Sequence, residues 1–290
     1  MKTSDIRDDR FLQAVNAIDS GDIAGLKELI SFDPNLIRKR LETPEEEAYF
    51  KNPYLLWFIA DNPIRNFKLA ENIVETTQLL ADAVKQYAPQ TAQLQLDYAL
   101  GLVATGRIPR ESGKQIAMMD VLIDAGAQPG GGKGALAHGN VDAANHLINR
   151  GGNLTVAVAV GLRRTDDIVK LLPQSDDGEK ITALTLAAFW GMDDMVSYLL
   201  GAGIDPNGYP PRGNGFHEHA TPLHQGVYSG SLETVKLLVE AGADLDAPDK
   251  AYNGNPLGWA IHMQTEEGAT QDMRAKYKII EDYLKAYNPE

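Results

Sequence analysis

The stretch that most constrains the fold runs from Thr221 to Asp246 and reads TPLHQGVYSGSLETVKLLVEAGADLD. Pro222 suits the first turn of a helix, because a proline there loses no hydrogen bond. A serine-glycine-serine break at 229–231 ends this short helix. Apolar residues then recur at steps of three and four, which is typical of an amphipathic second helix, and Gly242 ends it as a glycine cap. The stretch therefore predicts a helix-turn-helix unit.

The same pattern recurs along the chain with varying clarity. A good copy starts at Thr182 with TALTLAAFWG, and the last copy starts at Asn255 with NPLGWA. An earlier copy ends in Ala125–Ala127, which repeats the Ala-Gly-Ala of residues 241–243. Asp9–Leu41 reads as an N-terminal copy with two apolar faces on either side of a Ser-Gly-Asp break. Because each such unit buries its apolar face only against its neighbours, we expect a stack of units rather than separate pairs of helices.

The order TPLH, short helix, glycine, longer helix and Gly-Ala-Asp closely resembles an ankyrin repeat, whose period is about 33 residues. The resemblance is strong from Thr182 to Ala260, fair at the N-terminus and from Gly126 to Leu172, and weak from Thr43 to Leu94. It implies an all-α ankyrin solenoid of about eight helix-turn-helix units with elaborated loops. We expect one solenoid over residues 1–290, with divergent repeats in 1–90, intermediate ones in 91–178 and the clearest ones in 179–290.

Several local features qualify this pattern. The run YLLWFIA at 54–60 is apolar on all sides and predicts an inner, doubly covered helix. Thr43–Glu47 (TPEEE) reads as a helix start capped by threonine. Pro206–His219 is longer than a repeat needs and forms a turn-rich finger loop, and Thr265–Arg274 is a further insertion.

Two other elaborated loops, Asp61–Lys68 and Thr105–Lys114, carry basic residues. Equivalent loops of consecutive repeats lie side by side in a solenoid, so these side chains would form a basic patch on an otherwise acidic protein. Scattered, solvated charges are the simpler interpretation. The residues concerned are Arg65, Lys68, Arg107, Arg110 and Lys114.

Composition limits the class of partner and compartment. The formal charge of −13 argues against nucleic acid as a partner, because binding phosphates requires clustered Lys and Arg. A basic protein or peptide is compatible with that charge. No run of 18 apolar residues predicts a membrane helix, and the N-terminus lacks the apolar core of a secretory signal. The absence of cysteine excludes disulfides, and we expect a cytoplasmic protein.

Two motifs resemble chemical sites. His217, Glu218, His219 and His224 form the most metal-like cluster, but His224 is the histidine of TPLH, which in ankyrin repeats makes structural hydrogen bonds. The glycine-rich run 129–134 (PGGGKG) lacks the Ser or Thr and the preceding strand of a phosphate loop. No arrangement of Ser, His and Asp marks a nucleophile. We therefore predict no catalytic residue, cofactor or metal.

The expected partner site follows from the resemblance. Phe189-Trp190 and Tyr228-Ser229 occupy the two variable positions before the central glycine of their repeats, and in ankyrin repeats these positions face the concave, partner-binding groove. The alternative is that Phe189 and Trp190 only pack beneath a neighbouring finger. Including the aligned and finger-loop positions, the predicted partner-binding residues are Phe189, Trp190, Tyr228, Ser229, His262, Met263, Arg163, Tyr209 and Phe216.

These features together predict a non-catalytic scaffold that binds a protein or peptide through its concave groove and finger loops. The alternative is an enzyme or small-molecule binder that uses the elaborated loops of the N-terminal half. A closed pocket with convergent titratable groups would favour the alternative, and an open groove lined by aromatic side chains would favour the scaffold.

Overall fold

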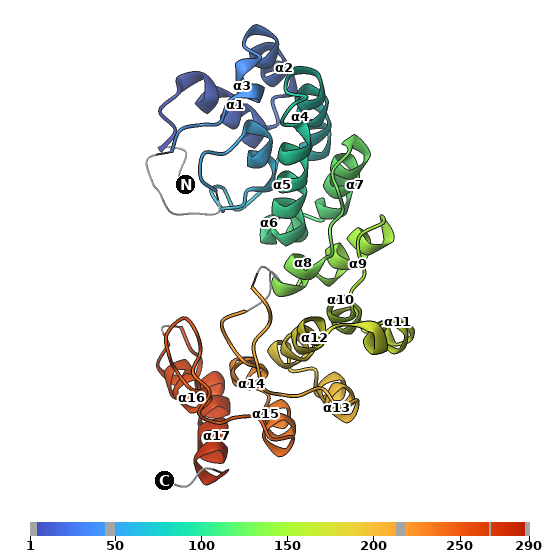
Figure 1. The fold of residues 1–290 in the computed structure, drawn as a ribbon. Coiled ribbons are helices and arrows are strands. Elements are labelled where there is room, and N and C mark those ends of the chain that lie inside the picture. Colours follow the sequence, from blue (N-terminus) through green and yellow to red (C-terminus); the bar gives the residue numbers. More distant parts are fainter. Residues whose placement is uncertain (1–4, 44–49, 213–217, 267, 288–290) are drawn as a thin grey trace. The chain divides into compact units, whose positions relative to one another are not determined.

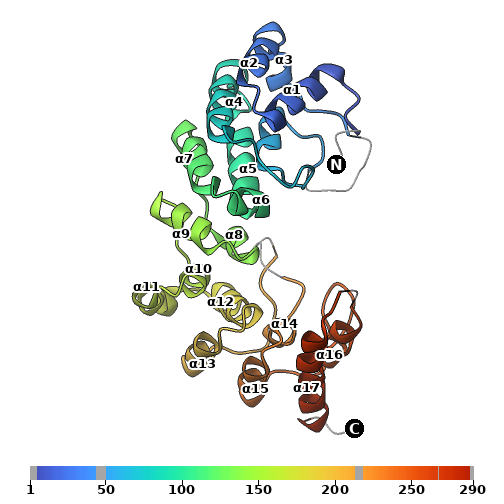
Figure 2. The same cartoon turned by 180° about the vertical axis from the view of Figure 1, so that it is seen from behind.

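The computed structural model describes residues 5–43, 50–212, 218–266 and 268–287. Every regular element in these ranges is a helix, and the chain divides into two compact units, Met1–Asn153 and Leu154–Glu290. Figure 1 labels the helices in chain order, and Figure 2 shows them from behind. Over the same described ranges, no helix has both the length and the apolar character needed to cross a membrane.

The first unit is a stack of helix pairs. One row contains α1, the 3₁₀-helix η2, α5 and α8, and the other contains α2, α4, α7 and α9, with successive members of each row in contact. Short helices α3 (Asn35–Arg38) and α6 (Arg107–Glu111) lie in the connections. The pairs are α1 (Asp9–Ser20) with α2 (Ile23–Phe32), η2 (Leu55–Ala60) with α4 (Ile73–Tyr87), α5 (Ala92–Thr105) with α7 (Gln115–Ala125), and α8 (Lys133–Ala137) with α9 (Val141–Asn149).

The second unit repeats this plan. Helices α10, α12, α14 and α16 pack in one row, and α13, α15 and α17 pack in succession in the other. The pairs are α10 (Val156–Gly161) with α11 (Thr165–Leu171), α12 (Asp177–Phe189) with α13 (Asp193–Gly201), α14 (Pro222–Ser229) with α15 (Leu232–Glu240), and α16 (Pro256–Thr265) with α17 (Gln271–Tyr287). A 3₁₀-helix, η3 (Leu172–Gln174), follows α11. The prediction of an all-α repeat solenoid of about eight units is confirmed.

The TPLH segment forms the helix start that its sequence predicts. The hydroxyl of Thr221 donates to Nδ1 of His224 at 2.7 Å and caps the first turn of α14. The other ring nitrogen of His224, Nε2, donates to the carbonyl of Gly254 at 2.9 Å, in the connection that precedes α16. Burial lowers the pKa of His224, which favours the neutral ring that this pattern requires. His224 therefore links two successive repeats, as its structural interpretation predicts.

Several predicted boundaries are wrong. Helix α12 begins at Asp177, before the expected start at Thr182, because Asp176 caps it by accepting from the backbone N–H of Glu179 at 2.8 Å. The expected loop Thr105–Lys114 contains helix α6. The run at 54–60 is buried throughout, as predicted, and residues 55–60 of it form a 3₁₀-helix.

The insertion Thr265–Arg274 is shorter than expected, because α16 runs to Thr265 and α17 begins at Gln271. The helix start predicted at Thr43–Glu47 lies largely outside the described residues.

In the turn after α10, the residue at the position of the central glycine is not the one that the sequence alignment predicts. Arg163 has φ +54°, in the left-handed region that Gly191 and Gly230 adopt at the ends of α12 and α14. Its N–H donates to Val160, and the N–H of Arg164 donates to Ala159, the bonds that Gly191 and Met192 make in the next repeat. Arg163 therefore occupies the position of the central glycine, and it is not the counterpart of Trp190.

One buried carboxylate organises the connection before α16. Asp249 accepts backbone N–H groups of Ala251, Tyr252 and Gly254 at 2.6–2.9 Å and the indole N–H of Trp259 at 3.0 Å. Burial alone would raise the pKa of Asp249, but these hydrogen bonds outweigh it and lower the pKa to about 2. The carboxylate thus favours the folded state while it is charged.

We predict that Asp249→Asn destabilises the C-terminal unit in a pH-dependent way. The pKa of Asp249 in the folded protein is about 2, below the ordinary aspartate value of 3.8, so the carboxylate contributes about 2 kcal/mol to stability above pH 4 and loses this contribution as the pH falls towards 2. Urea unfolding above pH 4 and near pH 2 measures the gap in free energy of unfolding between wild type and variant. The gap should shrink in acid, and a constant gap would contradict this account. The exposed neighbour Asp246 provides the control substitution Asp246→Asn.

Candidate functional site

Three aromatic side chains from two repeats form one cluster, hereafter the aromatic cluster. Phe189 at the end of α12 stacks on Tyr228 of α14, with ring centroids 5.2 Å apart and planes 10° from parallel. Trp190 meets Phe189 edge to face at 4.9 Å. Phe189 is 9% exposed, whereas Trp190 and Tyr228 are 44% and 43% exposed. The cluster therefore has a buried centre and two large aromatic surfaces open to solvent.

The turns that follow the cluster fix its geometry. Ser229 donates to the carbonyl of Gly226 at 2.7 Å and accepts from the backbone N–H of Ser231. Gly191 lies so close to this turn that an added Cβ would stand 3.2 Å from the Cβ of Ser231. Asp193 accepts hydrogen bonds from the hydroxyls of Ser231 and Thr234, which connects α13 to α15. The aromatic rings are therefore held by adjoining, hydrogen-bonded turns.

A third element supports Tyr228 from the C-terminal side. The hydroxyl of Tyr277, in α17, donates to the carbonyl of Tyr228 at 2.8 Å. Burial raises the pKa of Tyr277, so its hydroxyl stays protonated and able to donate at neutral pH. This bond orients the backbone of Tyr228 while its side chain remains exposed.

The surroundings of the cluster are acidic. Residues 154–290 contain 20 Asp and Glu against 11 Lys and Arg, a formal charge of −9 out of −13 for the whole chain. Acidic residues occupy the first turns of α11, α13 and α15, directly after the central turns. The exposed Arg163 is paired with one of them, Asp194, at 2.5 Å. A cationic partner is therefore electrostatically suited to this unit.

The cluster does not extend towards the C-terminus as the sequence predicts. His262 is exposed, but Met263 is buried. The alignment assumed a central turn at this point, whereas α16 continues to Thr265 and packs against α17. Ile261 is exposed instead.

Two finger-loop residues, Tyr209 and Phe216, are predicted to contact a partner, and the structure describes the first of them. Tyr209 donates its hydroxyl to the carbonyl of Pro248 at 2.6 Å, and the ammonium of Lys250 lies 3.8 Å from the centre of its ring. The first half of the finger is therefore packed against the connection before α16. Phe216 and His217 lie outside the described residues. Tyr209 and Phe216 stay predictions as partner contacts.

The prediction of a basic patch is wrong. The side chain of Arg65 is 3% exposed and pairs with Asp19 at 2.6 Å and Asp61 at 3.7 Å. Arg110 is bound to the carbonyl of His138 and to the side chain of Asn140, and Arg107 lies 3.9 Å from Glu111. These arginines serve local structure, because each has a partner within its own unit.

The two N-terminal loops do lie side by side, since both line one hollow. Lys68 and Lys114 contribute to it, together with Glu71 and Glu111, so acids balance the bases. Its volume is about 240 Å³, which is below the usual range for small-molecule sites, about 300–1,000 Å³. This hollow between the two loops therefore gives little support to the enzyme alternative.

The two remaining motifs are the metal-like histidine cluster, of which His217 lies outside the described residues, and the glycine-rich run 129–134. In the part of the chain that the structure describes, no group of three or more His, Asp or Glu side chains is placed to hold a metal ion. In the glycine-rich run, Gly132 has φ +75° and precedes the five-residue α8, and the carbonyl of Gly130 accepts from the N–H of Asn153. This run forms a turn between repeats.

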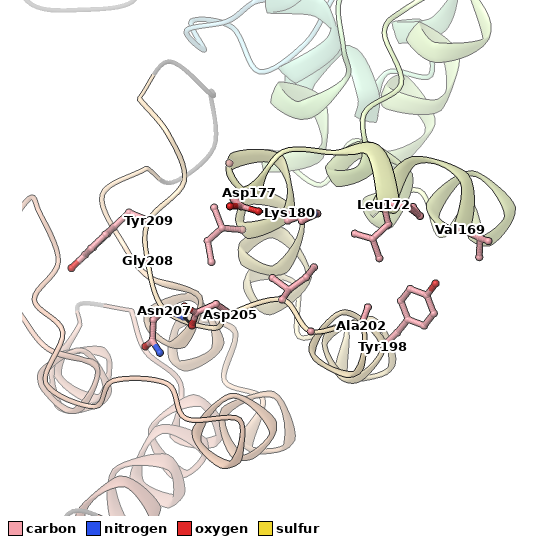
Figure 3. Close-up of a pocket in the computed structure, with 15 residues that line it drawn as sticks. Val169, Leu172, Asp177, Lys180, Tyr198, Ala202, Asp205, Asn207, Gly208 and Tyr209 are labelled. Carbon is pink, nitrogen blue, oxygen red and sulfur yellow. Dashed lines mark hydrogen bonds and ion pairs between the residues drawn. The ribbon is translucent and has the colours of Figure 1, made fainter.

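The sequence did not reveal a hollow in the C-terminal unit that has a volume of about 860 Å³. Figure 3 shows it between α11, the first turn of α12, α13 and the connection that carries Tyr209. Val169 and Tyr198 are exposed at its edge. The one feature of the sequence that could have indicated this hollow is the short connection between α11 and α12, residues 172–176.

Comparison with known families decides the nature of the repeats. Residues 133–249 match the family described as ankyrin repeats (3 copies). This part of the chain consists of ankyrin repeats. The matched region begins at α8 and includes the aromatic cluster, and helices α1 to α7 precede it. Ankyrin repeats generally serve as scaffolds for protein–protein interaction and are typically non-catalytic.

Two individual proteins are similar to parts of this chain. Over 80 residues the chain is 34% identical to the inactive serine/threonine-protein kinase TEX14 of Bos taurus, an alignment that spans 28% of this chain and 5% of that protein. A crystal structure of the human ASB11 ankyrin repeat domain aligns with 72% of this chain and 96% of its own, at 18% identity and a TM-score of 0.34.

Proposed function

We propose that the protein is a non-catalytic scaffold that binds a protein or peptide partner at the aromatic cluster and the neighbouring finger loops. The observation that carries this proposal is the stack of Phe189 on Tyr228 with Trp190 at its edge, half-exposed and built from two successive repeats. Large aromatic side chains dominate the binding energy of protein interfaces, especially where neighbouring contacts exclude water.

Two further features support a macromolecular partner. The rings lie on turns that are already held by hydrogen bonds, so a partner pays little to order them. Ser229 directly follows Tyr228 and is partly exposed, so it offers a polar group for the rim of an interface. His262 is exposed on α16 and stays a prediction as a partner contact. An exposed stack of this kind suits a flat or extended protein surface better than a small molecule, which needs enclosure.

A comparative pull-down tests the proposal. Wild-type protein, Trp190→Ala and Tyr252→Ala serve as baits in a lysate of the source cell, with bound proteins quantified by mass spectrometry. Tyr252 is the matched control, because it is an exposed aromatic residue of the same unit in another connection. We expect a partner that the wild type and Tyr252→Ala retain and Trp190→Ala loses. Equal retention by all three baits would contradict the proposal.

A further inference from the structure

A second binding site follows from the unequal lengths of the connections in the C-terminal unit. Between successive helix pairs the chain has five residues at 172–176, 20 at 202–221 and 15 at 241–255. The two long connections lie against each other. Asn207 donates to the carbonyl of Gly242 at 3.0 Å and accepts from the N–H of Asp244 at 2.8 Å, and the N–H of Lys250 donates to the carbonyl of His219.

The short connection provides no such neighbour on the other side of 202–221. Where a finger of the preceding repeat would lie, the structure has the 860 Å³ hollow shown in Figure 3. Among the described residues of the long connection, Pro211 lies close to Gly178 in the first turn of α12. An added Cβ at Gly178 would stand 2.6 Å from Pro211. The hollow is therefore partly covered by this connection and partly open to solvent.

The lining combines an apolar floor with a charged rim. Leu172, Ile181 and Ile204 are nearly buried at its base, and Val169 and Tyr198 rise beside them with 56% and 41% of their surface exposed. Asp177 and Asp205 are exposed at the rim, next to a single base, Lys180, which lies 3.7 Å from Asp177. Asp205 accepts the N–H of Asn207 and keeps further acceptor sites on its two oxygens.

We propose that this hollow is a second peptide-binding site, in which an extended segment of a partner protein takes the place of the missing finger. The segment would insert one apolar side chain between Val169 and Tyr198 and place Lys or Arg residues against Asp177 and Asp205. The negative charge of the whole unit, −9, favours such a basic segment and disfavours an acidic one. The hollow adjoins the first turn of α12, whereas the aromatic cluster is at the end of the same helix, so the hollow is distinct from the aromatic cluster, and Tyr209 of the finger loop lines the hollow.

The test uses a random-peptide display library selected on the full chain, with synthetic copies of the enriched peptides titrated by fluorescence anisotropy. We expect enriched peptides with an apolar residue flanked by Lys or Arg, and affinities that fall with added salt. Tyr198→Glu and Val169→Glu should each weaken binding about tenfold or more, and Asp177→Asn with Asp205→Asn should reduce both the affinity and the salt dependence.

The variants are chosen so that folding and the first site can be separated from the second. Val169 and Tyr198 are exposed, so Val169→Glu and Tyr198→Glu should leave the melting temperature unchanged. Unchanged melting temperatures would show that these substitutions act on binding alone. Trp190→Ala should leave these peptides bound, which distinguishes this site from the aromatic cluster. The proposal is overturned if no peptide is enriched, if enriched peptides lack basic residues, or if the substitutions in the hollow leave binding unchanged.

Discussion

Leu199→Ala should lower the free energy of unfolding by about 2–5 kcal/mol, the cost of removing a fully buried leucine from a packed core. Leu199 lies on α13 and is 0% exposed, and α13 packs against both α12 and α15. Urea unfolding of wild type and variant measures the loss. The neighbouring Ser197 is exposed on the same helix, so Ser197→Ala is the matched control and should stay within about 0.5 kcal/mol of wild type.

The distribution of that loss is as informative as its size. In a solenoid each repeat is stabilised by its neighbours, so weakening α13 should raise hydrogen exchange in α11 and α15 as well. The prediction of one solenoid over residues 1–290 is tested in the same experiment, because α8 and α9 should then respond too. A response confined to α12 and α13, with the helices on both sides unchanged, would contradict a repeat architecture.

Trp190→Ala is expected to weaken partner binding by about 30- to 1,000-fold, the effect of losing a hot spot worth about 2–4 kcal/mol. The side chain is 44% exposed before binding, so a partner that covers it gains a large aromatic surface. Titration of the partner identified by pull-down measures the change. Tyr228→Ala should weaken binding as well, because it removes the ring on which Phe189 stacks.

Local signals predicted most of the repeat plan. Pro222, the glycines at 191 and 230 and the apolar spacing of α13 and α15 each act within a few residues, and the structure places helices and turns where they indicate. Boundaries were wrong where a cap was missed, as at Asp176, which starts α12 early. The register at Arg163 was missed because a residue other than glycine adopts the left-handed conformation there.

The candidate site was predictable only in part. Repeat alignment identified Phe189, Trp190 and Tyr228 as neighbours, since equivalent positions of stacked repeats adjoin. Alignment could not show that Phe189 is the buried member, which depends on the stacking of its ring against Tyr228. It also misplaced Met263, because α16 continues where other first helices stop. The hollow beside α12 depends on how two connections of different length meet in space, which no single repeat encodes.

The most direct test of the central claim measures melting temperature and partner affinity together for Trp190→Ala, Tyr228→Ala and the control Tyr252→Ala. If the aromatic cluster is the partner site, the first two variants keep a melting temperature close to that of the wild type and lose affinity, while Tyr252→Ala keeps both. Strongly lowered melting temperatures with intact affinity would mean that Trp190 and Tyr228 serve the core of the solenoid, and the partner site would have to lie elsewhere.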